Sequence, residues 1–167
     1  MSTATLVSVE EYLRLTEKPY REYRDGVPFP KSTPTWSHGA VQVMLAMLLH
    51  KAGLRAGSEV SLRMSPTKVL IPDVIADVMA ARSMQDPYPT EPVLLCCEIL
   101  SPEDRLGPTL VKCEEYHAWG VPFCWVVDPV KRTAWEYHSG DEPVRAVGSL
   151  RAGKIDVSLS ELFSALD

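Results

Sequence analysis

Several features that would place this chain in a special class of protein are missing from its 167 residues. The longest apolar stretch, residues 40–49, is interrupted by Gln42 and is too short to span a bilayer, so no membrane segment is expected. No basic N-terminal region precedes an apolar run, so secretion is not indicated and we expect a cytoplasmic protein. Internal repeats, low-complexity tracts and domain linkers are also absent, and we expect residues 1–167 to form a single domain.

Cysteine is scarce and shows no spacing typical of a disulfide framework or a zinc site. The four cysteines are Cys96, Cys97, Cys113 and Cys124, and all of them lie in apolar or helical runs. Two of the four are adjacent, and no paired metal-ligand spacing links the others. We therefore expect small buried side chains in a reducing compartment.

A surplus of positive charge is also lacking, because the net charge is -5. Residues 1–68 carry nine Lys/Arg against six Asp/Glu, whereas residues 69–167 carry eight against sixteen. Broad nonspecific affinity for nucleic acid needs many cationic contacts to phosphates, and this balance argues against it. A metal-dependent enzyme is not excluded, because a bound cation neutralises acidic charge locally.

The sequence does contain the pattern of an α/β protein. Helix caps and apolar periodicity predict helices from Ser8 to before Pro19, from Thr35 or Ser37 to about residue 51, at residues 108–119, and after Ser158 or Ser160. Strands are predicted on both sides of a turn at residues 25–26 and at residues 59–64, 68–79, 93–99, 122–127, 133–137 and 144–147. Prolines predict loops at residues 28–34 and 82–92.

The strand–helix–strand segment at residues 93–127 predicts a right-handed crossover between two parallel strands, residues 93–99 and 123–127. Residues 133–137 and 144–147 are expected to form a final antiparallel pair. The expected architecture is therefore an α/β fold with a central mixed β-sheet flanked by helices.

Three charged residues stand where this fold would bring them together. Glu98 closes an apolar run and is half inside a core, where an unpaired charge costs several kcal/mol, so it needs a partner. Asp73 follows Pro72 on another predicted strand, and if the two strands are neighbours, Asp73 and Glu98 converge. Two close carboxylates repel each other, and a hard divalent cation such as Mg²⁺ relieves that repulsion.

Lys112, on the helix that follows Glu98, is placed to reach back over the strand end. A metal ion there would polarise a phosphoryl oxygen and lower the pKa of a bound water. The lysine would position or deprotonate that water, or stabilise charge on the phosphate oxygens. The three residues together predict metal-dependent cleavage of a phosphodiester bond.

Each of these residues also has a structural interpretation, which is the commoner outcome for a residue taken singly. Asp77 is an alternative to Asp73, because residues separated by two or four positions share one face of a strand. His38, at the start of an apolar helix, fits a capping or core histidine, and Glu22 fits a charged residue beside a turn. Solvated positions on a helix are expected for Glu114 and Glu115.

An ordered set of short motifs resembles the Uma-two family, a bacterial group of restriction-endonuclease-like proteins in the PD-(D/E)xK nuclease superfamily. The motifs are residues 71–74 (IPDV), 98–102 (EILSP), 112–116 (KCEEY), 120–122 (GVP) and 125–129 (WVVDP). Upstream, residues 22–26 (EYRDG) and 37–39 (SHG) resemble the family's glutamate before a turn and its histidine at the start of the long helix. The resemblance covers nearly the whole chain.

The resemblance implies a restriction-endonuclease-like core and Mg²⁺-dependent cleavage of DNA, with Mn²⁺ as a substitute ion. Asp73 and Glu98 would be metal ligands, with the carbonyl of Ile99 as a third, and Lys112 would be the catalytic lysine. Two further residues would line the same cleft: Glu22 as an outer or second-metal carboxylate, and His38 as a contact to phosphate or water.

The sequence departs from the commoner patterns at two positions. In the superfamily's basic motif the lysine lies two residues after the glutamate, where this chain has Leu100; in the Uma-two group the lysine comes from the following helix, as Lys112 does. The family usually has an acidic residue four positions before that lysine, where this chain has Pro108.

Two other functions remain open at this stage. A catalytically weak or inactive nuclease fold would serve as a binding or regulatory module, and a structural or assembly protein would keep the same carboxylates as surface charges. We also expect a two-fold homodimer, because two-fold symmetry is the commonest form of oligomer and cleavage of both strands needs two sites or one site used twice.

Overall fold

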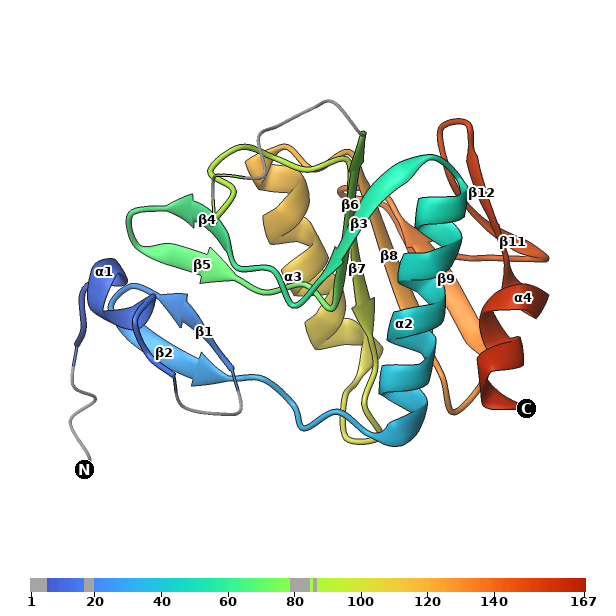
Figure 1. Cartoon of the computed structure of the whole chain (residues 1–167), viewed down its shortest axis with the longest axis horizontal. Coiled ribbons are helices and arrows are strands. Elements are labelled where there is room, and N and C mark those ends of the chain that lie inside the picture. The colour runs from blue at the N-terminus through green and yellow to red at the C-terminus, as the bar shows by residue number, and fades with distance from the viewer. Residues whose placement is uncertain (1–5, 17–19, 79–84, 86) are drawn as a thin grey trace.

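The computed structural model of the chain describes residues 6–16, 20–78, 85 and 87–167 (Figure 1). The helices are α1 (Val9–Tyr12), α2 (Trp36–Lys51), α3 (Leu106–Trp119), α4 (Leu159–Phe163) and the 3₁₀ helix η1 (Ser164–Leu166). The strands are β1 (Arg21–Arg24), β2 (Val27–Pro30), β3 (Leu54–Ser58), β4 (Leu62–Ser65), β5 (Lys68–Leu70), β6 (Val74–Val78), β7 (Leu95–Ile99), β8 (Phe123–Asp128), β9 (Thr133–Tyr137), β10 (Val144–Arg145), β11 (Ser149–Ala152) and β12 (Ile155–Ser158).

A six-stranded mixed sheet, in the order β10-β9-β8-β7-β6-β3, forms the centre of the fold. Strands β7 and β8 are parallel, with Leu95 opposite Phe123 and Ile99 opposite Val127, and the other pairs are antiparallel. The predicted parallel pair is therefore confirmed. Helix α3 connects β7 to β8 and packs on one face of the sheet, while α2 packs against β3 and β6 on the other (Figure 1).

Each face of the central sheet has its own hydrophobic core. Successive residues of β7 point alternately into the two cores: Leu95 and Cys97 belong to the core under α2, and Cys96 belongs to the core under α3. This period of two follows from the pleat of a strand. Glu98 has the same parity as Cys96 and therefore projects toward α3, which is the face on which the candidate lysine lies.

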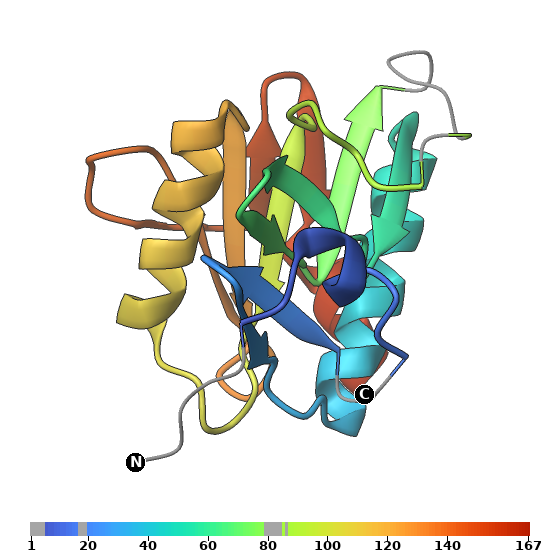
Figure 2. The ribbon, with the colours of Figure 1, turned by 90° about the vertical axis from the view of Figure 1, so that its left-hand side faces the viewer.

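A second, four-stranded sheet with the order β2-β1-β5-β4 stands in front of the central sheet in Figure 2, together with α1. The predicted strand at residues 68–79 is wrong as one element, because β5 belongs to the small sheet and β6 to the central sheet. Proline lacks an N–H group and cannot donate to a ladder, so the break falls at Pro72. Asp73 lies at this break, between the two sheets.

Other boundaries also differ from the predictions. The predicted loop at residues 28–34 begins as β2, which is an edge strand of the small sheet, a place where proline is tolerated. The predicted strand at residues 59–64 starts only at Leu62, and β3 was not predicted, because Gly53 and Gly57 obscure its pattern. The β11–β12 hairpin was not predicted either. Residues 82–84 and 86 of the predicted loop at residues 82–92 lie outside the described residues, and residues 85 and 87–92 contain no helix or strand, as predicted.

The predicted helices are largely confirmed. Helix α3 begins two residues before Pro108, which lies in its first turn, and ends at Gly120 with φ of 119°. Ser158 rather than Ser160 caps α4, and the predicted capping box is present in α1, although α1 ends at Tyr12. All four cysteines are buried with free thiols, as expected. None of the helices in the described part of the chain has the length and hydropathy that a membrane crossing requires.

Candidate active site

A cavity of about 210 Å³ lies where the small sheet, the ends of β6 and β7 and the first turns of α3 meet. All six residues that the sequence predicted for the site line this cavity: Glu22, His38, Asp73, Glu98, Ile99 and Lys112. Asp77, the alternative to Asp73, is not among its lining residues, and its carboxylate accepts the N–H of Val78. The two sheets therefore bring together residues that lie up to 90 positions apart in sequence.

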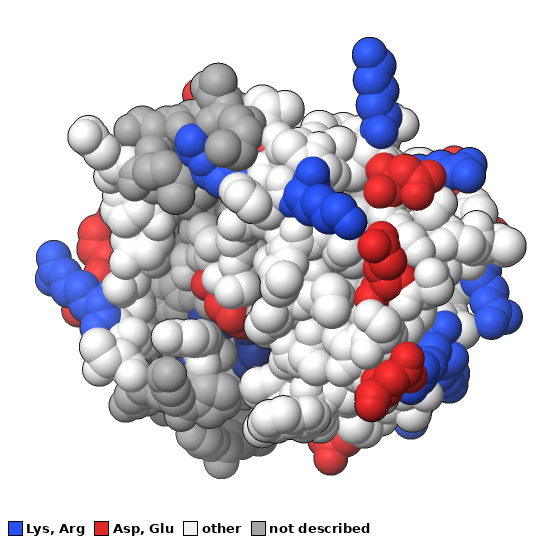
Figure 3. Space-filling view, turned by 45° about the vertical axis from the view of Figure 1, so that its right-hand side comes forward, with Lys and Arg blue, Asp and Glu red and all other residues white. Residues whose placement is uncertain are grey.

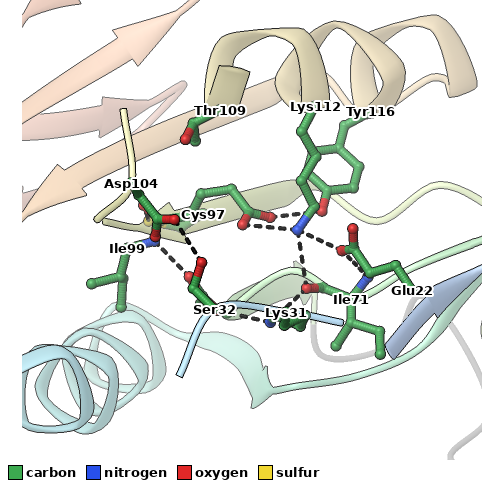
Figure 4. A network of polar contacts seen from close by, with 12 residues as sticks. Glu22, Lys31, Ser32, Ile71, Cys97, Ile99, Asp104, Thr109, Lys112 and Tyr116 are labelled. Atoms are coloured by element: carbon green, nitrogen blue, oxygen red, sulfur yellow. Dashed lines mark hydrogen bonds and ion pairs between the residues drawn. The ribbon is translucent and has the colours of Figure 1, made fainter. Parts of the chain in front are cut away.

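Lys112 extends from α3 into the cavity and joins two carboxylates (Figure 4). Its ammonium lies 2.9 Å from Oε2 of Glu98 and 2.6 Å from Oε1 of Glu22, and it donates to the carbonyl of Ile71 at 3.3 Å. Burial alone would lower the pKa of Lys112, but the charges of Glu98 and Glu22 outweigh it and raise that pKa above its ordinary value. Lys112 is therefore a permanent cation in this arrangement.

Glu98 is held from both sides. Its Oε2 binds Lys112, and its Oε1 accepts a hydrogen bond of 2.7 Å from the hydroxyl of Tyr116, one turn further along α3. Burial raises the pKa of Glu98 to about 7, although Lys112 opposes that shift, and the nearby charge of Asp73 adds to it. A carboxyl group with this pKa can carry or release a proton near neutrality.

Asp73 is held by a second lysine, Lys31, that the sequence reasoning missed. The Lys31 ammonium lies 2.9 Å from Oδ1 of Asp73, 2.9 Å from Oε2 of Glu59 and 2.8 Å from the carbonyl of Ile71. The other oxygen of Asp73, Oδ2, accepts the backbone N–H of Ile99 at 2.7 Å, which ties the start of β6 to the end of β7. Burial raises the pKa of Asp73, but the nearby basic side chains of His38 and Lys31 outweigh it and hold that pKa below its ordinary value.

His38 is buried at the edge of the same cluster. It is not the capping residue of α2, because its own backbone N–H is capped by Thr35. Its Nδ1 lies 3.3 Å from Oγ of Ser101, and its Nε2 lies 3.6 Å from Oδ1 of Asp73 and has no hydrogen-bond partner in the described part of the chain. A buried ring nitrogen without a partner is costly, so its position at the cavity favours a bound ligand.

The donor set fits a divalent cation. His38, Glu59 and Asp73 each offer a ligand atom, and these atoms lie within 4.8 Å of one another. Carboxylate oxygens suit Mg²⁺ and Mn²⁺, and an imidazole nitrogen is accepted by Mn²⁺ and similar ions. Glu98, one of the two predicted carboxylate ligands, is not part of this group of three, and its oxygens bind Lys112 and Tyr116.

The sequence carried a signal for some of the missed residues and none for others. Tyr116 lies four positions after Lys112 and therefore on the same face of α3, a spacing that could have identified it. Lys31 comes from a proline-rich loop, and Glu59 follows β3 with φ of 54°, so neither belongs to a periodic pattern. Their relation to Asp73 depends on how the two sheets meet.

The expectation of a solvated position was wrong for Glu115, whereas Glu114 is partly exposed but makes specific hydrogen bonds. Glu115 binds Arg24 and lies 2.7 Å from Lys68, which attaches α3 to the small sheet. Glu114 accepts hydrogen bonds from Tyr137 and from the loop that follows β9. These pairs hold in place the helix that carries Lys112.

One solved structure has the same architecture over nearly its whole length. A solved structure from Anabaena variabilis, described as a "putative nuclease belonging to DUF820", is 21% identical with a TM-score of 0.80 and covers 96% of this chain and 99% of its own. A chain of the DrdV–DNA complex is 18% identical with a TM-score of 0.45 and covers 77% of this chain and 10% of its own. No curated protein matches the chain.

The likeness to the Anabaena variabilis protein shows that the fold is that of the restriction-endonuclease-like proteins. The model of the Uma2 (Uma-two) family, described as "Putative restriction endonuclease", matches residues 9–165. That match includes both sheets and every residue of the cavity described above. The chain therefore belongs to the Uma2 family.

Proposed function

We propose that this protein is a metal-dependent endonuclease that hydrolyses phosphodiester bonds in DNA. One observation carries the proposal: Lys112, Glu98 and Asp73 line the same cavity. All three residues belong to the motifs that resemble the Uma2 family. Membership of the Uma2 family supports nuclease activity, and DNA as the substrate is the simplest extension of the family description.

Charge balance supports a divalent cation as the cofactor. The site contains two lysine clusters: Lys112 with Glu22 and Glu98, and Lys31 with Glu59 and Asp73. Together they hold four carboxylates but only these two ammonium groups. With all of these groups ionised the cluster carries two excess negative charges, which is unfavourable in a buried position. One divalent ion would neutralise this excess.

The residues that would hold the ion are Asp73 and Glu98 with the carbonyl of Ile99, as the family resemblance implies, and His38 and Glu59 lie within reach of Asp73. When bound, Mg²⁺ or Mn²⁺ supplies charge that polarises a phosphoryl oxygen and acidifies a bound water. The roles proposed for the chain's own residues do not depend on the exact position of the ion.

Lys112 acts in this proposal as a fixed positive charge rather than as a base. Its pKa is raised, and its ammonium is aimed into the cavity by Glu22 and Glu98. A cation in a buried position stabilises the charge that develops on phosphate oxygens in the transition state. Glu98 holds the Lys112 ammonium through Oε2, and with Asp73 it would hold the ion.

The proposal is tested by incubating supercoiled plasmid and single-stranded DNA with the protein in Mg²⁺, in Mn²⁺ and in EDTA. We expect cleavage with either ion and none in EDTA. Cleavage that persists in EDTA would exclude the metal mechanism, and metal binding without cleavage of any nucleic acid would select an inactive nuclease fold with a binding or regulatory role. The net negative charge of residues 69–167 favours that second function.

Self-association stays a prediction, and the exposed face of α2 is the surface we propose for a second copy of the chain. No Asp, Glu, Lys or Arg occurs between residues 36 and 50, and a broad uncharged area crosses the molecule in Figure 3. Trp36, Val43 and Met47 are 93%, 62% and 61% exposed and share one helix face with Ala40.

The apolar stripe formed by Trp36, Ala40, Val43 and Met47 is complementary to a second copy of itself related by a two-fold axis. In an antiparallel pair of α2 helices, position 36 lies opposite position 47, and the small residue at position 40 lies opposite position 43. Sedimentation at micromolar concentration should show a dimer, and Met47→Lys should give a monomer with the circular dichroism spectrum of the parent and a lower melting temperature, because association stabilises the folded chain. A parent protein that sediments as a monomer would overturn this assignment.

A further inference from the structure

Lys31 occupies an unusual place for a lysine, because its charged end is buried among carboxylates at the candidate metal site (Figure 4). The residue follows β2, and its side chain is 13% exposed. An ammonium group has three N–H donors, and here each has an acceptor: Asp73, Glu59 and the carbonyl of Ile71. Burial lowers the pKa of Lys31, but Asp73 and Glu98 outweigh it and raise that pKa, so the group is charged.

The atoms that Lys31 binds are also atoms that a divalent ion would use. In the group formed by His38, Glu59 and Asp73, both carboxylates are already bound to the Lys31 ammonium. Oδ2 of Asp73 accepts the N–H of Ile99, so Oδ1 is the oxygen that an ion would use. Oδ1 already binds the Lys31 ammonium and lies near Nε2 of His38. An ion that binds Oδ1 would lie within a few ångströms of the ammonium.

We propose that Lys31 is an internal competitor of the divalent cation: its ammonium and the ion bind the same carboxylate of Asp73, and each weakens the binding of the other. The inference rests on the proposed function and assigns a positioning residue within the same site. Two cations at such a separation repel strongly in a partly buried environment, so ion binding requires the Lys31 ammonium to move away from Asp73.

A merely structural role for Lys31 predicts the opposite sign. If Lys31 only attached its loop to the central sheet, its removal would loosen Asp73 and Glu59 and weaken ion binding or leave it unchanged. Competition predicts that its removal tightens ion binding, because two carboxylates lose their internal counter-ion. The direction of the change in affinity therefore separates the two roles.

The test is calorimetric titration of EDTA-treated protein with Mn²⁺ at about 0.15 M salt, which screens distant charges. Lys31→Gln has a slightly shorter side chain that still carries N–H donors but no charge, and we expect it to bind Mn²⁺ at least about tenfold more tightly than the parent. Lys31→Arg keeps the charge and should bind as weakly as the parent. Lys51→Gln is the matched control, because Lys51 is 74% exposed beside Glu161, and it should match the parent within about twofold.

Each result decides the proposal. If the parent binds Mn²⁺ and Lys31→Gln binds no more tightly, the competition is wrong while the proposed nuclease function stands. If neither protein binds Mn²⁺, both are wrong. If Lys31→Gln is unfolded without metal, its folding is followed by circular dichroism: folding at Mn²⁺ concentrations below the parent's dissociation constant supports the competition, and no folding at tenfold above that constant overturns it.

Discussion

Two lysines lie on either side of one carbonyl, that of Ile71, and the two clusters around them are built alike but from different parts of the fold. Lys112 joins Glu22 and Glu98, whereas Lys31 joins Glu59 and Asp73. The Lys112 cluster comes from regular elements, β1, β7 and α3, while Lys31 comes from the β2–α2 connection and Glu59 from the β3–β4 connection.

The difference teaches that similar contacts can serve different roles. The Lys112 cluster is tied by Tyr116 and by the ion pairs of Glu115, so its lysine is fixed on a helix beside the cavity. The Lys31 cluster depends on a loop residue and lies beside Nε2 of His38, which has no hydrogen-bond partner among the residues that the structure describes. We therefore assign the first cluster to the chemical step and the second to the control of ion binding.

The largest expected effect comes from breaking the Lys112 cluster. Lys112→Ala should lower the rate of DNA cleavage by about 10²–10⁴-fold, which in most assays means no detectable cleavage. Lys112→Ala should still bind the ion at least as tightly as the parent, because Lys112 adds no ligand and its loss removes a nearby positive charge, and its far-ultraviolet circular dichroism spectrum should match that of the parent. Lys131→Ala, at a lysine that is 75% exposed, is the control and should cleave normally. Equal activity of Lys112→Ala and the parent would remove Lys112 from the site.

Breaking the second cluster should affect ion binding instead. Asp73→Asn keeps the shape of the side chain but removes a charged ligand, so Mn²⁺ affinity should fall by about 100-fold or more, at the upper end of what residues around a metal contribute. Asp77→Asn, in the strand β6 that follows Asp73, is the matched control and should leave Mn²⁺ affinity unchanged. Calorimetric titration measures both variants. A normal affinity in Asp73→Asn with a loss in Asp77→Asn would exchange their assignments.

A smaller effect concerns pH, and it sharpens the comparison because the two carboxylates shift in opposite directions. The pKa of Glu98 is raised from 4.5 to about 7, so between these values the folded chain binds more protons than the unfolded chain. The free energy of unfolding of the metal-free protein should therefore fall as pH rises from about 4.5 to 7, by up to about 3 kcal/mol.

Urea titrations at pH 5, 6, 7 and 8 measure this change. In Glu98→Gln the fall should disappear, because the group no longer titrates. Asp73 acts in a separate range: its pKa is lowered, so its contribution to stability is present above its ordinary pKa and is lost only in stronger acid. A parent protein whose stability rises steadily between pH 5 and 7 would contradict the raised pKa of Glu98.

Much of this arrangement could be predicted from the sequence where local patterns determine it. The apolar run before Glu98 identified a buried strand, and the cap at Gly120 fixed the end of the helix that carries Lys112. Their spacing around a parallel crossover placed both residues on one side of the sheet. The Lys112–Glu98 contact follows from these elements alone.

The second cluster could not be predicted because no local pattern encodes it. Pro72 divides one apparent strand between two sheets, and this division places Asp73 against residues that lie far away in sequence. Lys31 meets Asp73 across 42 positions and Glu59 across 28, through loops without periodicity. Contacts of this kind depend on how the small sheet packs on the central sheet, which the sequence pattern does not specify.

The most direct test of the central claim is the rate of plasmid cleavage measured over a range of Mn²⁺ concentrations for the parent, Lys112→Ala and Asp73→Asn. We predict a saturating dependence on Mn²⁺ for the parent, with no cleavage in EDTA. Asp73→Asn should need about 100-fold more Mn²⁺ to reach half of its maximal rate, and Lys112→Ala should not cleave at any concentration although it binds the ion. Cleavage by the parent that is independent of Mn²⁺, or identical curves for all three proteins, would contradict the assignment of this cavity as a metal-dependent nuclease site.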